Sequence, residues 1–211
     1  MRKFGVLCIL IGAALMASAL LLYQLNRQED RKAQEAVVEV MPQLVEKARE
    51  NAARESDGQE PAITEDDLLI PVELLTQEQL EMTEEVIDGH AYIGYLSIPK
   101  LGQELPVMSQ WSYPKLKIAP CRYSGSLRGE DLVLMAHNYT GHFSRISQLE
   151  LMDELTFTTM DGDVITYQVV GEDILHPTAV EEMTSGDFDL TLFTCNYGSS
   201  RRITVYCERV K

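Results

Sequence analysis

The segment Leu190-Thr191-Leu192-Phe193-Thr194-Cys195 decides the fold, because it is an uninterrupted, mostly apolar run of β-favouring residues that ends at a cysteine. A second such run, Ile203–Arg209, follows after the turn-prone residues Asn196-Tyr197-Gly198-Ser199-Ser200. Strands joined by a loop of about seven residues are typically antiparallel neighbours. We therefore expect the chain to end in a β-hairpin, with Cys195 where the first strand meets the loop.

The residues that precede this hairpin also favour β structure. Tyr92–Ile98 is a β-rich run stopped by Pro99, and Leu132–Ala136 is a short apolar run typical of a strand buried on both faces. Asp161-Gly162 is a hairpin signal between the runs Leu155–Thr159 and Val164–Val170. Short strands at this spacing predict a mainly β domain over residues 91–211, either a closed barrel or a sandwich.

The N-terminus contains a candidate membrane anchor. Phe4–Leu25 is a run of 22 residues without a charge, which as a helix would span about 33 Å, enough to cross a bilayer. Arg2 and Lys3 precede it, so we expect the N-terminus to stay in the cytoplasm and the rest of the chain outside. A cleaved signal peptide ending near Ala17-Ser18-Ala19 is the alternative, and we favour the uncleaved anchor.

Residues 26–90 form an acidic stalk with six basic and 18 acidic side chains. One apolar stripe at helical spacing predicts a partly helical segment, interrupted by Pro42 and ended by Ser56-Asp57-Gly58. The stripe consists of Val37, Val40, Met41, Leu44, Val45 and Ala48. Two interpretations stay open: a solvated spacer, which we favour, or a segment within Leu68–Ile87 that forms a short helix, docks on the domain and regulates it.

Composition excludes several classes of protein. The 211 residues include 18 Lys+Arg and 33 Asp+Glu, a formal charge of −15, which disfavours nucleic acid as a partner. The four cysteines, Cys8, Cys121, Cys195 and Cys207, are too few for a disulfide scaffold and contain no CxxC pair for zinc. We expect Cys207 to pack in the core and Cys121 to lie on a loop. No cofactor or metal is predicted, and Glu172, Asp173, Glu181 and Glu182 are expected to be solvated rather than to bind calcium.

Three residue types that support cysteine chemistry occur near strand ends. Cys195 at a strand end would be accessible at the rim of the domain, although most free cysteines are simply buried. A nucleophilic cysteine needs a base, and His137 directly follows the Leu132–Ala136 run, whereas His90, His142 and His176 have less favourable positions. Arg201 and Arg202 begin the last strand on opposite faces, so only one of them can point toward Cys195.

Taken together, these residues resemble the sortase family, the membrane-anchored cysteine transpeptidases of Gram-positive bacterial surfaces. Residues 191–195 are similar to the family's TLxTC signature, Met135-Ala136-His137-Asn138-Tyr139 resembles the segment around its catalytic histidine, and Arg201-Arg202 matches its late arginine. Gly94-Tyr95-Leu96-Ser97-Ile98-Pro99 resembles the GxLxIP opening, and Pro177-Thr178-Ala179-Val180 resembles a PTxV segment. The resemblance covers about residues 92–210. Ala136 and Asn138 depart from one common form of the family, which leaves the subclass open.

The resemblance implies a sortase-type closed barrel of about eight strands with short helices, preceded by the anchor (residues 1–25) and the stalk (26–90). It implies that Cys195 attacks an LPxTG-like sorting signal to form a thioester, which a peptidoglycan amine or a pilin lysine resolves. His137 would transfer protons, and Arg202 would donate hydrogen bonds to the oxyanion, with Arg201 as the alternative donor. The implied location is the cell membrane, crossed once, with the barrel outside.

Two other functions remain open from the sequence. A membrane-anchored cysteine peptidase would use the same residues and pass its thioester to water instead of an amine. A catalytically inactive extracellular binding module is disfavoured, because the Cys195, His137 and arginine set is intact.

Overall fold

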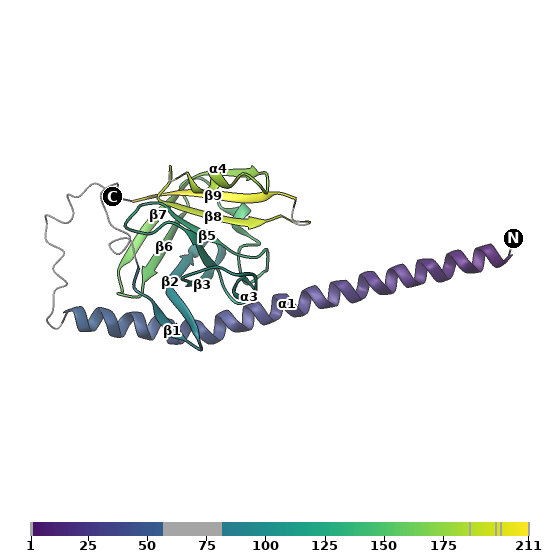
Figure 1. Cartoon of the computed structure of the whole chain (residues 1–211), viewed down its shortest axis with the longest axis horizontal. Helices are drawn as coiled ribbons and strands as arrows, with labels where there is room; N and C mark the ends of the chain where they lie inside the picture. Colours follow the sequence, from purple (N-terminus) through teal and green to yellow (C-terminus); the bar gives the residue numbers. More distant parts are fainter. Residues whose placement is uncertain (1, 57–81, 186, 197, 199, 211) are drawn as a thin grey trace.

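The computed structural model describes residues 2–56, 82–185, 187–196, 198 and 200–210. Eight strands form a closed barrel, in which sheet neighbours run in the order β2-β3-β4-β5-β8-β9-β7-β6 and β6 pairs again with β2. The strands are β2 (His90–Ile98), β3 (Gln103–Met108), β4 (Cys121–Ser124), β5 (Leu132–Met135), β6 (Glu154–Thr159), β7 (Val164–Leu175), β8 (Leu190–Cys195) and β9 (Arg202–Arg209). The prediction of a closed barrel of about eight strands is confirmed (Figure 1).

Short elements complete the barrel. Strand β1 (Glu85–Ile87) pairs with the start of β2, so the ordered sheet begins before the boundary expected at residue 91. The described helices outside the N-terminus are α3 (Tyr113–Leu116), α4 (Val180–Thr184) and the 3-10 turns Pro99–Leu101 and Ile146–Gln148. The hairpin expected at Asp161-Gly162 is present, because β6 and β7 pair antiparallel across it.

The barrel interior is filled by one face of each strand. On β8 and β9 the inward residues include Leu190, Leu192, Val205 and Cys207, all fully buried. The outward face of β8 is buried too, because Phe193 packs with Val133 and with Met183 of α4. Strand β8 is therefore covered on both faces until its last residue, Cys195, which is half-buried. An apolar run buried on both faces is the pattern that its sequence predicts.

A continuous helix, α1 (Arg2–Ser56), leads from the N-terminus to the barrel and packs along it (Figure 1). Its buried residues are Ala33 and five of the six residues of the predicted stripe, Val37, Val40, Met41, Leu44 and Ala48. The sixth, Val45, is partly buried. The stripe lies against the barrel rather than in solvent, so the interpretation of this part of the stalk as a solvated spacer is wrong. Most of the segment Leu68–Ile87, for which we considered a regulatory helix, lies outside the described residues.

The prediction that Pro42 interrupts this helix is also wrong. Proline inside a helix costs about 3 kcal/mol, because it removes one hydrogen bond and crowds the preceding turn. Pro42 lies on the exposed side of α1, while Met41 and Leu44 on either side are buried against the barrel. Burial of one such side chain contributes about 1.5–3 kcal/mol. The stripe as a whole therefore outweighs the proline.

The first half of α1 projects away from the barrel (Figure 1). Its large apolar side chains between Ile9 and Leu25 are between 48% and 72% exposed. This segment lies in a helix that is long and apolar enough to cross a membrane by length and composition. Exposed apolar surface of this extent needs a nonaqueous partner.

Candidate active site

The candidate site lies at the edge of the sheet where β5 and β8 end. The two strands are parallel neighbours in register, with Met135 opposite Phe193, so their carboxyl ends meet at the same edge. Beyond the last paired residues, the Thr194 hydroxyl donates a hydrogen bond of 2.8 Å to the carbonyl oxygen of Ala136. This buried bond ties the residue before Cys195 to the residue before His137. The two strand ends therefore converge at this edge.

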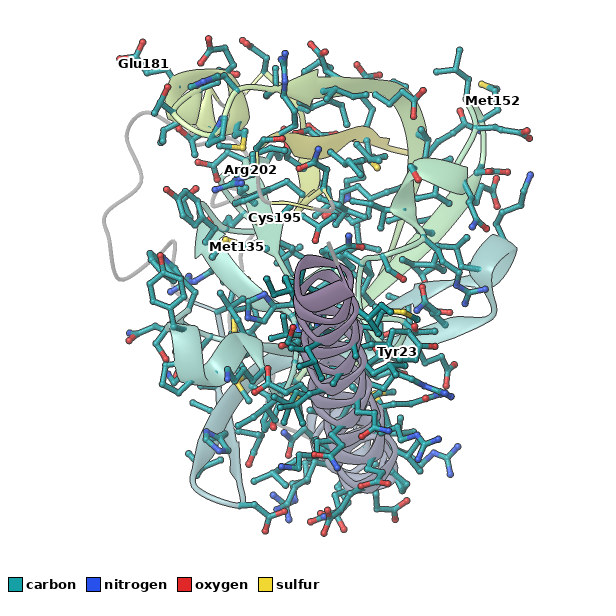
Figure 2. All side chains as sticks on the ribbon, turned by 90° about the vertical axis from the view of Figure 1, so that its right-hand side faces the viewer. Tyr23, Met135, Met152, Glu181, Cys195 and Arg202 are labelled. Carbon is teal, nitrogen blue, oxygen red and sulfur yellow. The ribbon has the colours of Figure 1, made fainter. Side chains whose placement is uncertain are left out.

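Cys195 and Arg202 occupy directly opposed positions on β8 and β9. Opposed residues of an antiparallel pair project from the same face. Both are half-buried, and Figure 2 shows them next to Met135 on one face of the barrel. The preceding arginine, Arg201, is exposed. Its backbone N–H donates to Asn196 Oδ1 at 3.0 Å, which closes the loop between the strands.

His137 is half-buried one residue beyond Ala136, in the loop that leaves β5. Its ring lies 4.9 Å from that of Tyr139, centroid to centroid. Burial lowers the pKa of His137, and the positive charge of Lys117 lowers it further, while the carboxylate of Glu29 acts in the opposite direction. The imidazole is therefore biased toward its neutral form, which accepts protons.

Helix α1 holds the loop that contains His137. Glu29 accepts a hydrogen bond from the Tyr139 hydroxyl at 3.1 Å and pairs with Lys117 at 2.9 Å. Asp30 accepts one from the backbone N–H of Thr140 at 2.6 Å. Gly141 packs so closely that a Cβ there would lie 3.0 Å from the Cα of Gln34. These contacts could not be predicted from the sequence, because the hydrogen-bonded partners are 110 residues apart and match no known motif.

The three predicted catalytic residues lie at the ends of neighbouring strands, without direct bonds between their described side chains. In the portion of the chain that is described, no hydrogen bond joins Cys195, His137 and Arg202. The Arg202 guanidinium instead contacts the carbonyl oxygen of Arg201 at 3.5 Å. The neighbouring strands β5, β8 and β9 therefore bring an imidazole-, a thiol- and a guanidinium-bearing residue to one edge of the sheet.

The other three histidines lie away from the ends of β5 and β8. His142 is fully buried, its Nε2 lies 3.2 Å from the carbonyl oxygen of Ile118, and burial lowers its pKa to about 4. His176 is exposed and its Nδ1 lies 2.8 Å from the Thr178 hydroxyl. His90 is the first residue of β2. None of these three lies at the end of β5 or β8.

The remaining described cysteines are buried and free. Cys207 packs in the core of the barrel, as expected. The prediction that Cys121 lies on a loop is wrong: it is the first residue of β4, is fully buried, and pairs with Met135. Burial raises the pKa of its thiol to about 12. The Pro120 ahead of Cys121 suggested a loop, whereas the strand begins directly after it.

The acidic side chains considered for calcium, Glu172, Asp173, Glu181 and Glu182, are exposed. Among the described residues, no three His, Cys, Asp or Glu side chains gather as a metal site would require.

The closed β-barrel thus brings to one edge a cysteine at the end of one strand, an arginine opposite it and a histidine just beyond the adjacent parallel strand. These are the residue types that cysteine-based acyl transfer uses. The sequence model of the sortase domain matches residues 96–210. The chain therefore belongs to the sortase family, a family of cysteine transpeptidases, as its motifs predicted. No curated protein sequence matches the chain.

Solved structures agree with the family. Sortase C1 from Streptococcus suis is similar at 28% identity with a TM-score of 0.52, over 58% of this chain and 74% of that one. Sortase C from Streptococcus pneumoniae, described in relation to pilin substrate specificity, is 25% identical with a TM-score of 0.53, over 80% and 88%. Sortase A from Corynebacterium diphtheriae shares the fold at 18% identity and a TM-score of 0.52, over 92% and 96%.

Proposed function

We propose that the chain is a membrane-anchored transpeptidase that cleaves an LPxTG-like sorting signal and transfers the released acyl group to an amine. The observation that supports this proposal most directly is the opposition of Cys195 and Arg202 on β8 and β9, beside the end of β5 that leads to His137. The acceptor amine belongs to peptidoglycan or to a pilin lysine. Because a similar sortase is described in relation to pilin substrates, both kinds of acceptor amine should be tested.

In the first step, the Cys195 sulfur attacks the carbonyl carbon of the scissile peptide bond. Neutral His137 takes the thiol proton and gives it to the departing amine, so that the C–N bond breaks and a thioester forms. The low pKa that burial gives to His137 keeps it able to accept that proton. In the second step, His137 takes a proton from the incoming amine, and the Cys195 thiolate leaves as the new amide forms.

Arg202 acts on the charge that develops at the carbonyl oxygen. Its guanidinium projects from the same face as Cys195 and provides hydrogen-bond donors for the oxyanion. Removal of one such donor typically costs about 3 kcal/mol of transition-state stabilisation. The exposed Arg201 is engaged in the loop through its backbone, which favours Arg202 for this role.

We also propose the layout of the chain in the cell. Residues 1–25 would form the cytoplasmic tip and the anchor, residues 26–90 the stalk, and residues 91–211 the catalytic barrel outside the membrane. The charge-free run after Arg2 and Lys3 supports this orientation. The docked part of α1 makes the first section of the stalk a rigid support for the barrel.

Product analysis tests the reaction. The full chain in detergent is incubated with a library of LPxTG-like peptides, with and without an added peptide amine, and the products are identified by mass. Transpeptidation predicts a ligated product that depends on the amine and on Cys195. Release of the free acid alone, unaffected by any amine, would assign the chain to hydrolysis and contradict the proposal.

A further inference from the structure

Two exposed aromatic side chains and two lysines, one half-buried and one exposed, gather around α3. Trp111 is 41% exposed and Tyr113 is 73% exposed. Lys115 lies within α3, and Lys117 directly follows that helix. We call these four residues, Trp111, Tyr113, Lys115 and Lys117, the aromatic–basic patch. The catalytic mechanism uses none of them as a reacting group.

Helix α1 fixes the position of this patch relative to the apolar segment. Lys117 Nζ lies 2.9 Å from Glu29 Oε1. Glu29 is four residues beyond Leu25, which ends the charge-free run. At 1.5 Å of rise per residue, the two positions are about 6 Å apart along the helix. Figure 1 shows α3 beside α1 on the side of the barrel from which the apolar half of the helix projects.

The aromatic rings are held in place by one another. Trp111 stacks on Tyr123 with 5.8 Å between ring centroids and meets Tyr113 edge to face at 5.9 Å. Tyr123 in turn packs edge to face on Phe193 of β8 at 5.3 Å. The Ser112 hydroxyl caps α3 by accepting the backbone N–H of Lys115. The ring contacts with Tyr123 and Phe193 therefore hold Trp111 and Tyr113 in place while both rings stay partly exposed.

Tryptophan, tyrosine and lysine are the side chains that favour the boundary between lipid and water, because each joins an apolar body to a polar tip. The chain has a formal charge of −15, yet basic side chains recur at this level. Arg27, Arg31 and Lys32 follow the apolar run on α1, interleaved with Glu29, Asp30 and Glu35. Two lysines lie in the patch, and one of them, Lys117, is also paired with Glu29. We propose that the aromatic–basic patch contacts the headgroup region of the membrane that α1 spans, as a second attachment of the barrel to a lipid surface.

This contact rests on the proposed anchor and determines how the barrel faces the membrane. Figure 2 views the molecule from the N-terminal side of α1, and Met135, Cys195 and Arg202 are visible on that face. Tyr123, which supports Trp111, packs on Phe193, two residues before Cys195 on the same face of β8. A barrel attached through the patch would present its catalytic edge toward the bilayer.

Trp111 is the single tryptophan of the chain, so its fluorescence reports on the patch without any substitution. The full chain is reconstituted into phosphatidylcholine vesicles, with or without phosphatidylglycerol, in which a fraction of the lipid has a nitroxide on the headgroup. We expect the nitroxide lipid to reduce Trp111 emission at least twofold, and more strongly in the anionic vesicles. Unchanged emission in vesicles that contain the protein would overturn the contact and leave the patch to a protein partner.

A matched control moves the tryptophan away from the patch. Val86 on β1 is 66% exposed, and its neighbour Glu85 accepts a hydrogen bond from Asn51 of α1 at 3.2 Å. Asn51 is 26 residues beyond Leu25, or about 39 Å along the helix. The double variant Trp111→Phe/Val86→Trp should therefore show no quenching. Failure of the chain to float with the vesicles would instead contradict the anchor, which separates the two proposals.

Discussion

The two ends of the β8–β9 hairpin contain the same reactive residue type in opposite surroundings. At one end Cys207 is paired with Leu190, faces the barrel interior and is fully buried. At the other end Cys195 is paired with Arg202, faces outward and is half-buried. Burial raises the pKa of the Cys207 thiol far above its ordinary value, so this thiol stays protonated. Position along one hairpin therefore separates a structural cysteine from a candidate nucleophile.

The register of the hairpin determines which of the two cysteines faces the barrel interior. Alternate residues of a strand face opposite sides, so a shift of one residue would exchange the two faces of the hairpin. In the observed register, Leu190, Leu192 and Val205 fill the barrel. The same register places Cys195 and Arg202 together outside it. The packing of the core thus fixes the geometry of the candidate catalytic end.

Separate replacement of each cysteine by alanine should give the largest difference in activity between two variants. Cys195→Ala removes the nucleophile, and we expect transpeptidation to fall by about 10⁴-fold or more with little change in stability. Cys207→Ala leaves a small cavity in the core and should lower the free energy of unfolding by about 1–2 kcal/mol. Its turnover should remain within about threefold of the wild type. Peptide ligation assays and urea denaturation measure the two effects.

The two arginines provide the next contrast at the catalytic end. Arg202→Ala should lower kcat by about 100-fold, because the oxyanion loses its donor. Arg201→Ala should lower it by less than about fivefold, because the Arg201 contact to the described part of the loop is made by its backbone. Steady-state kinetics with one sorting peptide measure kcat for both variants. A larger loss in the Arg201 variant would transfer the role to that residue.

Two threonines of the hairpin test whether the hydrogen bond between the ends of β5 and β8 is needed for activity. Thr194→Val removes the bond to the Ala136 carbonyl, and we expect a cost of about 1–2 kcal/mol in stability and a kcat about tenfold lower as His137 shifts. The Thr204 hydroxyl is buried without a partner in the described structure. Thr204→Val should therefore be neutral or slightly stabilising. Equal losses of activity in both variants would argue against a role of the Thr194–Ala136 hydrogen bond in positioning His137.

The smallest expected effect concerns the charge that α1 places near His137. The Glu29 carboxylate raises the pKa of His137 against the stronger effects of burial and Lys117. Glu29→Gln removes that contribution, so the pKa of His137 should fall and more of the imidazole should be neutral at a given pH. The acidic limb of the kcat/KM profile should then move to lower pH. Glu39→Gln, at an exposed site on the same helix, should leave the limb in place.

Local patterns predicted most of the secondary structure that forms the candidate catalytic edge. The final hairpin, the strand ahead of His137 and the helical stripe of α1 all follow from spacing and from turn residues, which depend on short stretches of chain. The docking of α1 on the barrel did not follow, because a stripe shows that a helix needs a partner without identifying the partner. The contacts of Glu29 and Asp30 with the His137 loop depend on that docking. Pro42 and Cys121 were assigned wrongly because tertiary packing outweighed local preference.

The most direct test of the account is the location of the acyl group on the enzyme. The full chain is incubated with an LPxTG-like peptide without an amine, quenched in acid and digested with trypsin. Arg201 and Arg202 lie between Cys195 and Cys207, so the two thiols fall in separate fragments. We predict one hydroxylamine-sensitive acyl group, on the fragment that contains Cys195. Acylation of another cysteine, or turnover of the peptide without any acylated fragment, would contradict the account.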